Sequence, residues 1–391
     1  MYKRQIIVCA EPFTLSLQGS SSAAGLTYKW QRSTDNIIWT DIAGATNFTY
    51  TTAQNGSTYY RAVVNCGSES AISASVQVIS PSLVSGTFTI NNALATSIPA
   101  GTFTSFNDAY DYIKCGINGP VIFNVVNNLA TTGAYNEQLI MAPVPGASAT
   151  NTVTFKGRGS TIGFLSNNSA ERAVIKLRGA DNIRFDSLII NATAGTFGYG
   201  VQLISNADSN VVSNCIINTN SLATTTNYAG IVINATEAGP ISTGTVLCDY
   251  NVFSNNTING GYLGISLAAS LTGANGNNQF VNNTVNDFYL YGIYVGSSYG
   301  TLIENNSFSR PTRTTVSDFI GIHFTGISTT ARVSKNRISN PFGGLPASTN
   351  TFTGINFLSV DATPSNENIV SNNLISGING NGTQTGISNT G

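Results

Sequence analysis

Hydrophobic and polar residues recur in one short two-part phrase that appears seven times between Ile183 and Gly386. The first part is a hydrophobe, two residues, a polar corner residue, one further residue and a second hydrophobe. The second part is a glycine with apolar residues at the first and third positions after it. Successive glycines are 30, 34, 28, 29, 33 and 32 residues apart, at Gly200, Gly230, Gly264, Gly292, Gly321, Gly354 and Gly386. A period in this range is typical of stacked structural repeats.

Each phrase predicts a coil of short parallel strands. The apolar runs have strand length, are rich in β-branched and aromatic residues, and end at Asn, Gly, Ser or Thr, whereas no unit has the helical periodicity that an α-solenoid needs. Alternation predicts two inner stacks, in which like residues of neighbouring coils lie about 4.8 Å apart. The stacks are Val201, Ile231, Ile265, Ile293, Ile322 and Ile355, and Leu203, Ile233, Leu267, Val295, Phe324 and Phe357.

The polar corner residue of the first part predicts a ladder. An odd spacing separates the two hydrophobes of this part, so a continuous strand cannot place both inside and the chain has to turn between them. Asn tolerates the left-handed conformation that such a turn uses, and stacked Asn amides can hydrogen-bond along the stack. The predicted structural ladder is Asp186, Asn214, Asn256, Asn283, Asn306, Asn336 and Asn373.

This order of strand, Asn corner, strand, long loop and third strand resembles the right-handed parallel β-helices of the pectin-lyase-like superfold. We expect residues 86–391 to form such a helix, with coils from about Val121. Phe106, Ala109 and Ile113 fall on one face of a short predicted helix after Ser105, which would cap the first coil. The last phrase weakens near the end of the sequence, so we expect the native chain to continue.

Residues 6–80 predict a small β-sandwich. Five strand-like runs recur at short intervals, and Cys9 and Cys66 bracket Trp30. The runs around residues 28–31, 39–42 and 59–61 resemble immunoglobulin-like (Ig-like) repeats of large secreted bacterial proteins. That resemblance implies a Cys9–Cys66 disulfide in an oxidising, extracytoplasmic setting, with two free buried thiols as the alternative.

The whole chain is therefore predicted to be all-β, an Ig-like sandwich followed by a right-handed parallel β-helix with an N-terminal capping helix. Residues 105–109, 119–125, 135–139 and 146–148 resemble the opening of β-helix domains in Bacteroidota surface proteins, which are often exported by the type IX route. This resemblance implies an extracellular or cell-surface location and flanking domains in a longer parent chain.

Composition excludes several classes of partner. The 391 residues are only 9% charged with a formal net charge of −1, so we expect no nucleic-acid partner. No apolar run approaches the roughly 18 residues of a membrane span. Cys115, Cys215 and Cys248 do not have metal-ligand spacing, and their pairing is left open. We predict no metal and no cofactor.

The resemblance implies a substrate cleft on the outer face of the sheet that contains the Gly-led strands. Lyases and hydrolases of the superfold need carboxylates there, as acid and base or as Ca²⁺ ligands. The outward residues two positions after each glycine include no carboxylate: Gln202, Val232, Ser266, Tyr294, His323, Asn356 and Ser388. The catalytic candidates are Asp287 and Asp318 from the loops, with His323 as a base that they could orient.

Other side chains suggest binding. Alternation points Tyr294 outward, Tyr291 is a candidate for the interior, and Tyr299 is expected in a loop, so a stacking platform for sugar rings is a hypothesis. The candidate ligand-binding residues are Gln202, Tyr294, Tyr299, His323 and Asn356. The charged run Glu171, Arg172, Lys176, Arg178, Asp181, Arg184 and Asp186 favours a solvated ladder of paired charges, with an acidic-polysaccharide site as the alternative.

Three functions remain open from the sequence. The preferred one is a non-catalytic extracellular surface or adhesion module that contacts a polysaccharide or cell-surface glycan. A polysaccharide lyase or glycoside hydrolase requires loop carboxylates to converge. A carbohydrate-binding module would use Tyr294, His323 and Asn356.

Overall fold

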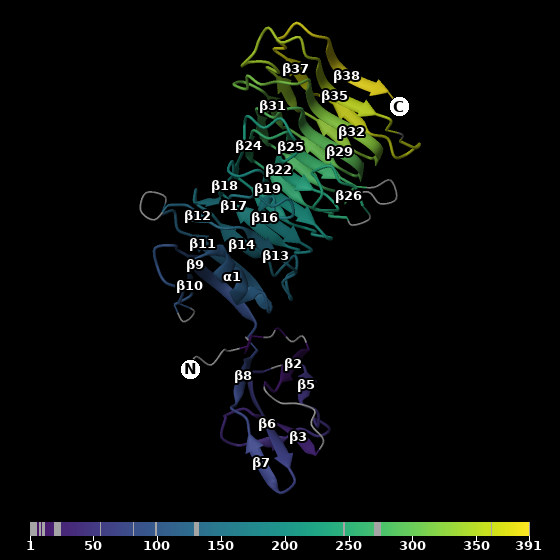
Figure 1. Cartoon of the computed structure of the whole chain (residues 1–391). Helices are drawn as coiled ribbons and strands as arrows, with labels where there is room; N and C mark the ends of the chain where they lie inside the picture. Colours follow the sequence, from purple (N-terminus) through teal and green to yellow (C-terminus); the bar gives the residue numbers. More distant parts are fainter. Residues whose placement is uncertain are drawn as a thin grey trace. The chain divides into compact units, whose positions relative to one another are not determined.

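The computed structural model describes residues 6–7, 9, 12–18, 25–54, 56–80, 82–97, 100–128, 133–244, 247–269, 275–360 and 362–390. The chain divides into two compact units (Figure 1). Unit 1 is Met1–Val84 together with Tyr112–Asn118, and unit 2 is Ser85–Asp111 together with Gly119–Gly391. Residues 112–118, inside the segment from which we predicted the β-helix, thus group with unit 1.

Unit 1 contains two small sheets around one core. One sheet has the order β1-β8-β6-β3-β4 with β7 beside β6, and the other is the antiparallel pair β2-β5. Leu15, Trp30 and Tyr60 are buried in the core, and the Trp30 indole donates to the Asn47 carbonyl. The strands are β1 (Ile6–Ile7), β2 (Phe13–Ser16), β3 (Leu26–Ser33), β4 (Thr40–Asp41), β5 (Thr49–Thr52), β6 (Thr58–Cys66), β7 (Glu69–Ile72) and β8 (Val76–Ile79).

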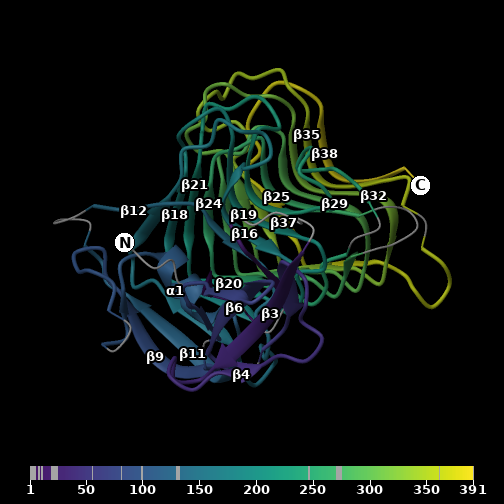
Figure 2. The same ribbon diagram turned by 60° about the horizontal axis from the view of Figure 1, so that its bottom comes forward.

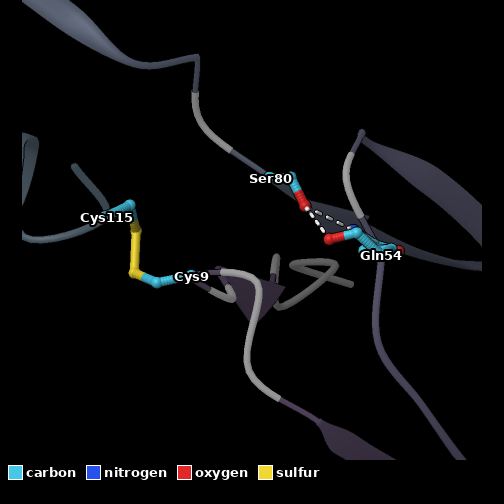
Figure 3. Close-up of a disulfide and its surroundings, with 4 residues drawn as sticks. All are labelled: Cys9, Gln54, Ser80 and Cys115. Atoms are coloured by element: carbon cyan, nitrogen blue, oxygen red, sulfur yellow. Dashed lines mark hydrogen bonds between the residues drawn. A yellow bond between two sulfur atoms is a disulfide. The ribbon is translucent and has the colours of Figure 1, made fainter. Parts of the chain in front are cut away.

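The disulfide of unit 1 joins Cys9 to Cys115, near the hydrogen-bonded pair Gln54 and Ser80 (Figure 3). The predicted Cys9–Cys66 bond is therefore wrong. Cys66 is the last residue of β6 and is an exposed free thiol. The Cα atoms of Cys9 and Cys115 are 4.5 Å apart, a separation that a disulfide requires and that sequence spacing could not reveal.

Unit 2 is a parallel β-helix built from three long sheets, and successive strands of each sheet stack one on the next (Figures 1 and 2). Sheet 1 has the order β10 (Thr102–Phe103), β9 (Val84–Ile90), β11 (Ile117–Val125), β14 (Val153–Lys156), β17 (Ile183–Asp186), β20 (Val211–Ser213), β23 (Val252–Ser254), β27 (Gln279–Val281), β30 (Leu302–Glu304), β33 (Arg332–Ser334) and β36 (Ile369–Ser371).

The other two sheets follow in the same coils. Sheet 2 has the order β12 (Tyr135–Asn136), β15 (Thr161–Gly163), β18 (Ile189–Ala192), β21 (Ile216–Thr219), β24 (Thr257–Asn259), β28 (Thr284–Asn286), β31 (Ser307–Ser309), β34 (Arg337–Ser339) and β37 (Leu374–Ser376). Sheet 3 has the order β13 (Leu139–Met141), β16 (Ala173–Arg178), β19 (Gly198–Ile204), β22 (Tyr228–Ile233), β25 (Leu263–Ala268), β29 (Tyr291–Tyr299), β32 (Phe319–Thr329), β35 (Phe352–Leu358) and β38 (Gln384–Thr390), with β26 (Asn275–Gly276) beside β29.

The strand register confirms both predicted inner stacks. Val201 pairs with Ile231 and Leu203 with Ile233, and the same pairing continues coil by coil to Ile355 and Phe357. The stacked side chains are buried, and aromatic members lie face to face, as with Phe324 and Phe357 at 4.8 Å between ring centroids. Apolar residues therefore stack on apolar residues along both inner rows.

The one helix among the described residues is α1 (Phe106–Ile113), in the predicted place. Phe106 and Ala109 are fully buried, and the Phe106 ring stacks 5.7 Å from that of Phe155. The Ser105 hydroxyl accepts a hydrogen bond from the Asp108 amide, while the Glu137 carboxylate accepts from the amides of Phe106 and Asn107. These acceptors satisfy donors of the first helical turn.

The Asn ladder lies at the corner between sheets 1 and 2. In each rung the side-chain oxygen of one Asn accepts from the backbone amide and the side-chain amide of the Asn one coil earlier, with donor–acceptor distances of 2.8 to 3.0 Å. The prediction is confirmed for Asn256, Asn283, Asn306, Asn336 and Asn373.

The predicted rungs Asp186 and Asn214 are wrong. The register aligns Phe185 with Val212 and Phe253, so the ladder position of the first two phrases is Leu188 and Cys215. Counting from Ile183 and Val211 shifted both phrases out of register. Asn214 instead occupies the left-handed position that precedes the ladder, with φ of 55°, like Asn255, Asn282, Asn305 and Asn372 in later coils.

A second Asn ladder, absent from our predictions, lies at the corner between sheets 3 and 1. The side-chain oxygen of Asn251 accepts from the amide of Asn210, and that of Asn278 accepts from the amide of Asn251. All three residues are buried. The signal was available, since each Asn stands two positions before the inward hydrophobe of its strand.

Candidate functional site

The outer face of sheet 3 carries the candidate residues. An outer row stands two positions after the glycine position: Lys176, Gln202, Val232, Ser266, Tyr294, His323 and Asn356. The glycines are required where the coils approach closely. A Cβ atom on Gly264 would lie 2.7 Å from the carbonyl oxygen of Gly292.

A loop covers the first part of this row. Residues 234–244, here called the lid segment, lie over the outer row: the Gln202 side-chain amide donates to Asn234, and the Ser266 hydroxyl donates to the Pro240 carbonyl. Lys176, Gln202 and Ser266 are fully buried. The alternation was right, but Gln202 is not accessible to a ligand in this conformation.

Charged groups lie beneath and beside the lid segment. Glu237 of the lid pairs with Lys176 at 2.8 Å and with Arg178 at 2.9 Å. Arg172 donates to the Ala238 carbonyl and to the Tyr199 hydroxyl. The predicted solvated charge ladder is therefore wrong at Lys176, whose side chain is buried against a partner 61 residues away in the sequence.

The second part of the outer face carries an aromatic cluster: Tyr262, Tyr289, Tyr291, Tyr294 and His323. Tyr291 lies 5.0 Å from His323 and 5.5 Å from Tyr294 between ring centroids, and Tyr294 lies 5.5 Å from His323. Tyr262 and Tyr289 form a neighbouring pair at 5.5 Å. The four tyrosines are half-buried. Tyr291 thus belongs to the outer face, and its suggested inward position is wrong.

His323 is a neutral hydrogen-bonding group at neutral pH. Its side chain is only 4% exposed, and burial lowers the pKa of the imidazole from 6.5 to about 4. The side-chain nitrogen of Asn356 lies 3.0 Å from Nδ1 of His323. Because the amide nitrogen donates, Nδ1 accepts and the proton resides on Nε2. An amide therefore occupies the position where a catalytic imidazole would need a carboxylate.

The two candidate carboxylates stabilise loops. Asp287 accepts from the amides of Thr312 and Arg313 and from the Thr312 hydroxyl, at 2.7 to 3.0 Å. Asp318 accepts from the Thr351 amide at 2.8 Å. Among the described residues, no contact joins either carboxylate to His323, so the structure does not bring the three candidates together.

A column of aspartates was not predicted as a unit. The carboxylates of Asp181, Asp208 and Asp249 each accept from a backbone amide one coil further on, at 2.6 to 2.7 Å. Burial raises the pKa of Asp181 and Asp208. Tyr299 lies over Gly276 beside this column rather than in the aromatic cluster. The recurring Asp-x-Asn-Val sequence at Asp208 and Asp249 was the available signal.

A shallow cavity of about 440 Å³ lies on the outer face of sheet 2. Its floor is Gly163, which pairs with Asn136 and Asn191 on either side and leaves a gap between their side chains. The other lining residues are Phe164, Leu165 and Ala194. No predicted site residue lines this cavity.

The described part of the chain holds neither a metal-ligand cluster nor a membrane-spanning helix. No three His, Cys, Asp or Glu side chains there are arranged to hold a metal ion. No helix in the same residues has the length and apolar character needed to cross a membrane.

The comparisons with known proteins are partial. Residues 2–81 match the model of DUF8696, a domain of unknown function, and no curated protein matches the chain. The pectin methylesterase of Aspergillus niger is 13% identical, with a TM-score of 0.33 over 76% of this chain and 87% of that chain. A glycoside hydrolase is 10% identical, with a TM-score of 0.41 over 90% of this chain and 68% of that chain.

A third solved structure is the catalytic domain of a GH87 α-1,3-glucanase in complex with nigerose. It is 11% identical, with a TM-score of 0.29 over 97% of this chain and 89% of that chain. Likeness at these identities and TM-scores assigns neither a family nor a function to this chain. The strand pairing of unit 2 itself defines the class, a parallel β-helix protein with an aromatic cluster on the outer face of sheet 3.

Proposed function

We propose that the chain is a non-catalytic extracellular surface or adhesion module that contacts glycans through the aromatic cluster of sheet 3. The carrying observation is the contiguous arrangement of Tyr291, Tyr294 and His323, at 5.0 to 5.5 Å between rings, on one face. Sugar rings stack on aromatic faces, and the phenol hydroxyls and the Asn356 amide can exchange hydrogen bonds with sugar hydroxyls.

The polar contacts around the cluster support binding without turnover. Acid–base cleavage of a glycan needs carboxyl groups aimed at the reacting bond. Here Asp287 and Asp318 accept hydrogen bonds from their own loops, and His323 is held by an amide. These groups do not form an acid–base pair.

The proposal extends to the setting of the protein. The Cys9–Cys115 disulfide favours an oxidising compartment, in keeping with a Bacteroidota-type surface protein exported by the type IX route. Unit 1 would be an Ig-like spacer, an assignment supported by its two sheets around Trp30. Helix α1 would cap the first coil, an assignment supported by Phe106 stacked on Phe155.

Binding to a polysaccharide panel tests the proposal. Neutral and acidic polysaccharides would be titrated against the wild-type chain, Tyr294→Ala and Tyr291→Ala by calorimetry. We expect each substitution to weaken binding roughly tenfold, equivalent to about 1.4 kcal/mol of stacking. Tyr250→Ala is the matched control, since Tyr250 is 57% exposed and outside the cluster. Equal affinities for all variants would remove the cluster from the proposal.

A turnover assay tests the non-catalytic part separately. Incubation with pectins, alginates and glycosaminoglycans, with and without Ca²⁺, should release no reducing ends and no unsaturated product. Turnover that is lost in Asp287→Ala or Asp318→Ala would overturn this part and favour a lyase or hydrolase.

A further inference from the structure

The lid segment places a carboxylate between two cations. The two oxygens of Glu237 lie 2.8 Å from Nζ of Lys176 and 2.9 Å from a terminal nitrogen of Arg178. The Lys176 side chain is fully buried, and its second partner is the Ala170 carbonyl at 2.8 Å. A buried ammonium requires such a partner, because an uncompensated charge is costly away from water.

The floor beneath the lid segment, formed by Lys176, Gln202 and Ser266, contains one hydrogen-bond acceptor without a donor. Gln202 is fully buried, and its side-chain nitrogen donates to Asn234 at 3.0 Å. Its side-chain oxygen has no hydrogen-bond partner among the described residues. A buried acceptor without a donor is unfavourable. A ligand hydroxyl at this place could donate to the Gln202 side-chain oxygen, a hydrogen bond that the lid segment does not provide.

The lid segment lies outside the strands of the coils. Residues 234–244 contain no strand or helix and follow β22. The Ala235 amide donates to the Ser242 carbonyl at 3.3 Å, so the chain closes at the base of the six residues between them. Opening of the lid segment breaks side-chain contacts with Lys176, Arg178, Arg172, Gln202 and Ser266 but no strand pairing. Loops that gate ligand sites open in this way.

We propose that the lid segment is an autoinhibitory strap, in which Glu237 occupies a carboxylate site formed by Lys176 and Arg178 that an acidic glycan takes when the strap is displaced. The proposal rests on the proposed function, that the outer face of sheet 3 binds glycans. A uronate carboxylate or a sulfate ester replaces Glu237, and sugar hydroxyls meet Gln202 and Ser266. When the lid segment is displaced, Gln202 and Ser266 form one continuous surface with the aromatic cluster, because Ser266 pairs with Tyr294 of the next coil.

Affinity measurements on the full chain test the strap. The probes are oligogalacturonate, which carries carboxylates, dextran sulfate, which carries sulfates, and neutral dextran. We expect Glu237→Gln to bind one or both acidic probes at least tenfold more tightly than the wild type. This gain follows if the lid segment is open in about one wild-type molecule in ten or fewer, because the closed molecules do not bind the probe. Glu171→Gln, a charge-matched change at an exposed carboxylate, should equal the wild type.

Two further variants keep the test decisive if Glu237→Gln folds poorly. Replacement of residues 236–241 by Asn-Gly, a two-residue turn that suits the closed base, should give the same gain. Adding Lys176→Met to Glu237→Gln should cancel the gain for the acidic probes, and neutral dextran should gain less than the acidic probes in each of these variants. Hydrogen exchange of residues 234–244 should be faster in Glu237→Gln than in Glu171→Gln.

The outcomes separate this inference from the function on which it rests. If the wild type binds glycans through Tyr294 but neither Glu237→Gln nor the shortened loop gains affinity for an acidic probe, the strap is wrong and the proposed function stands. If neither the wild type nor any variant binds a glycan, both are overturned. An equal gain in Glu171→Gln would indicate a general charge effect and would also overturn the strap.

Discussion

Units 1 and 2 are stabilised in different ways. Unit 1 has a small core around Trp30 and Tyr60, and one disulfide that closes a span of 106 residues. Unit 2 repeats the same contacts coil after coil, in its inner stacks and Asn ladders. Small domains bury a smaller fraction of their surface, while repeat proteins add similar contributions from neighbouring units. The disulfide therefore contributes a large share of the stability of unit 1, whereas each ladder rung contributes a small share of the stability of unit 2.

Removal of the disulfide is the largest expected perturbation. Cys9→Ser should destabilise unit 1 by about 2–5 kcal/mol, because the unfolded chain gains the freedom that the long closed loop denied it. Trp30 and Trp39, the two tryptophans of the chain, both lie in unit 1, so their fluorescence during urea unfolding follows this unit.

Cys66→Ser is the control for that measurement. The Cys66 thiol is exposed and forms no disulfide, so we expect its replacement to change the free energy of unfolding by no more than about 0.5 kcal/mol. If Cys66→Ser destabilised the fluorescence transition as much as Cys9→Ser did, the pairing seen here would be contradicted and the Ig-like pairing would regain support.

Removal of one ladder rung should have a smaller effect. In Asn283→Ala the amides of Asn256 and the carbonyl of Phe253 lose their partners, and Asn306 loses one donor to its side-chain oxygen. The expected cost is about 1–3 kcal/mol, because buried polar groups are left unpaired. Far-UV circular dichroism during urea unfolding measures it.

A neighbouring residue gives the control for the rung. Asn282 precedes Asn283, is left-handed with φ of 59°, and lies outside the ladder. Asn282→Gly keeps the left-handed conformation accessible and should change stability by no more than about 0.5 kcal/mol. An unchanged unfolding curve for Asn283→Ala would show that one rung is dispensable.

The same contrast explains what the sequence could predict of the fold. Features that recur in unit 2 could be predicted because seven copies expose the period, and five rungs of the ladder followed from it. The error at Asp186 and Asn214 arose because the count started at the hydrophobes Ile183 and Val211, which precede the residues that align with Phe253. The partner of Cys9 occurs once, far along the chain, and no period points to it.

The candidate site was predictable only in part. Alternation assigned Tyr294, His323 and Asn356 correctly to one outer row, because strand geometry sets which residues share a face. Exposure does not follow from alternation. The lid segment belongs to the widest glycine interval, from Gly230 to Gly264, but its sequence has no period that shows where it folds. Hence the burial of Lys176 and Gln202 could not be predicted.

Acidification acts on the outer face of unit 2, and its effect is limited to a pH range. His323 titrates at about 4 in the folded chain, lowered by burial from the value of 6.5 that an unfolded chain would show. Between these values the unfolded chain binds a proton that the folded chain does not. Stability is therefore constant above pH 6.5, falls as the pH falls from 6.5 to 4, and is constant again below 4 for this group.

His323→Asn isolates that contribution, since other groups titrate in the same range. Asn is neutral throughout and matches Asn356 one coil further on. The stability difference between wild type and variant should shrink by on the order of 1–3 kcal/mol from pH 7 to pH 4, because burial opposes protonation of the imidazole in the folded chain. Urea unfolding followed by far-UV circular dichroism measures it at each pH. A pH-independent difference would mean that His323 is protonated equally in both states, and the neutral donor assigned to the aromatic cluster would be lost.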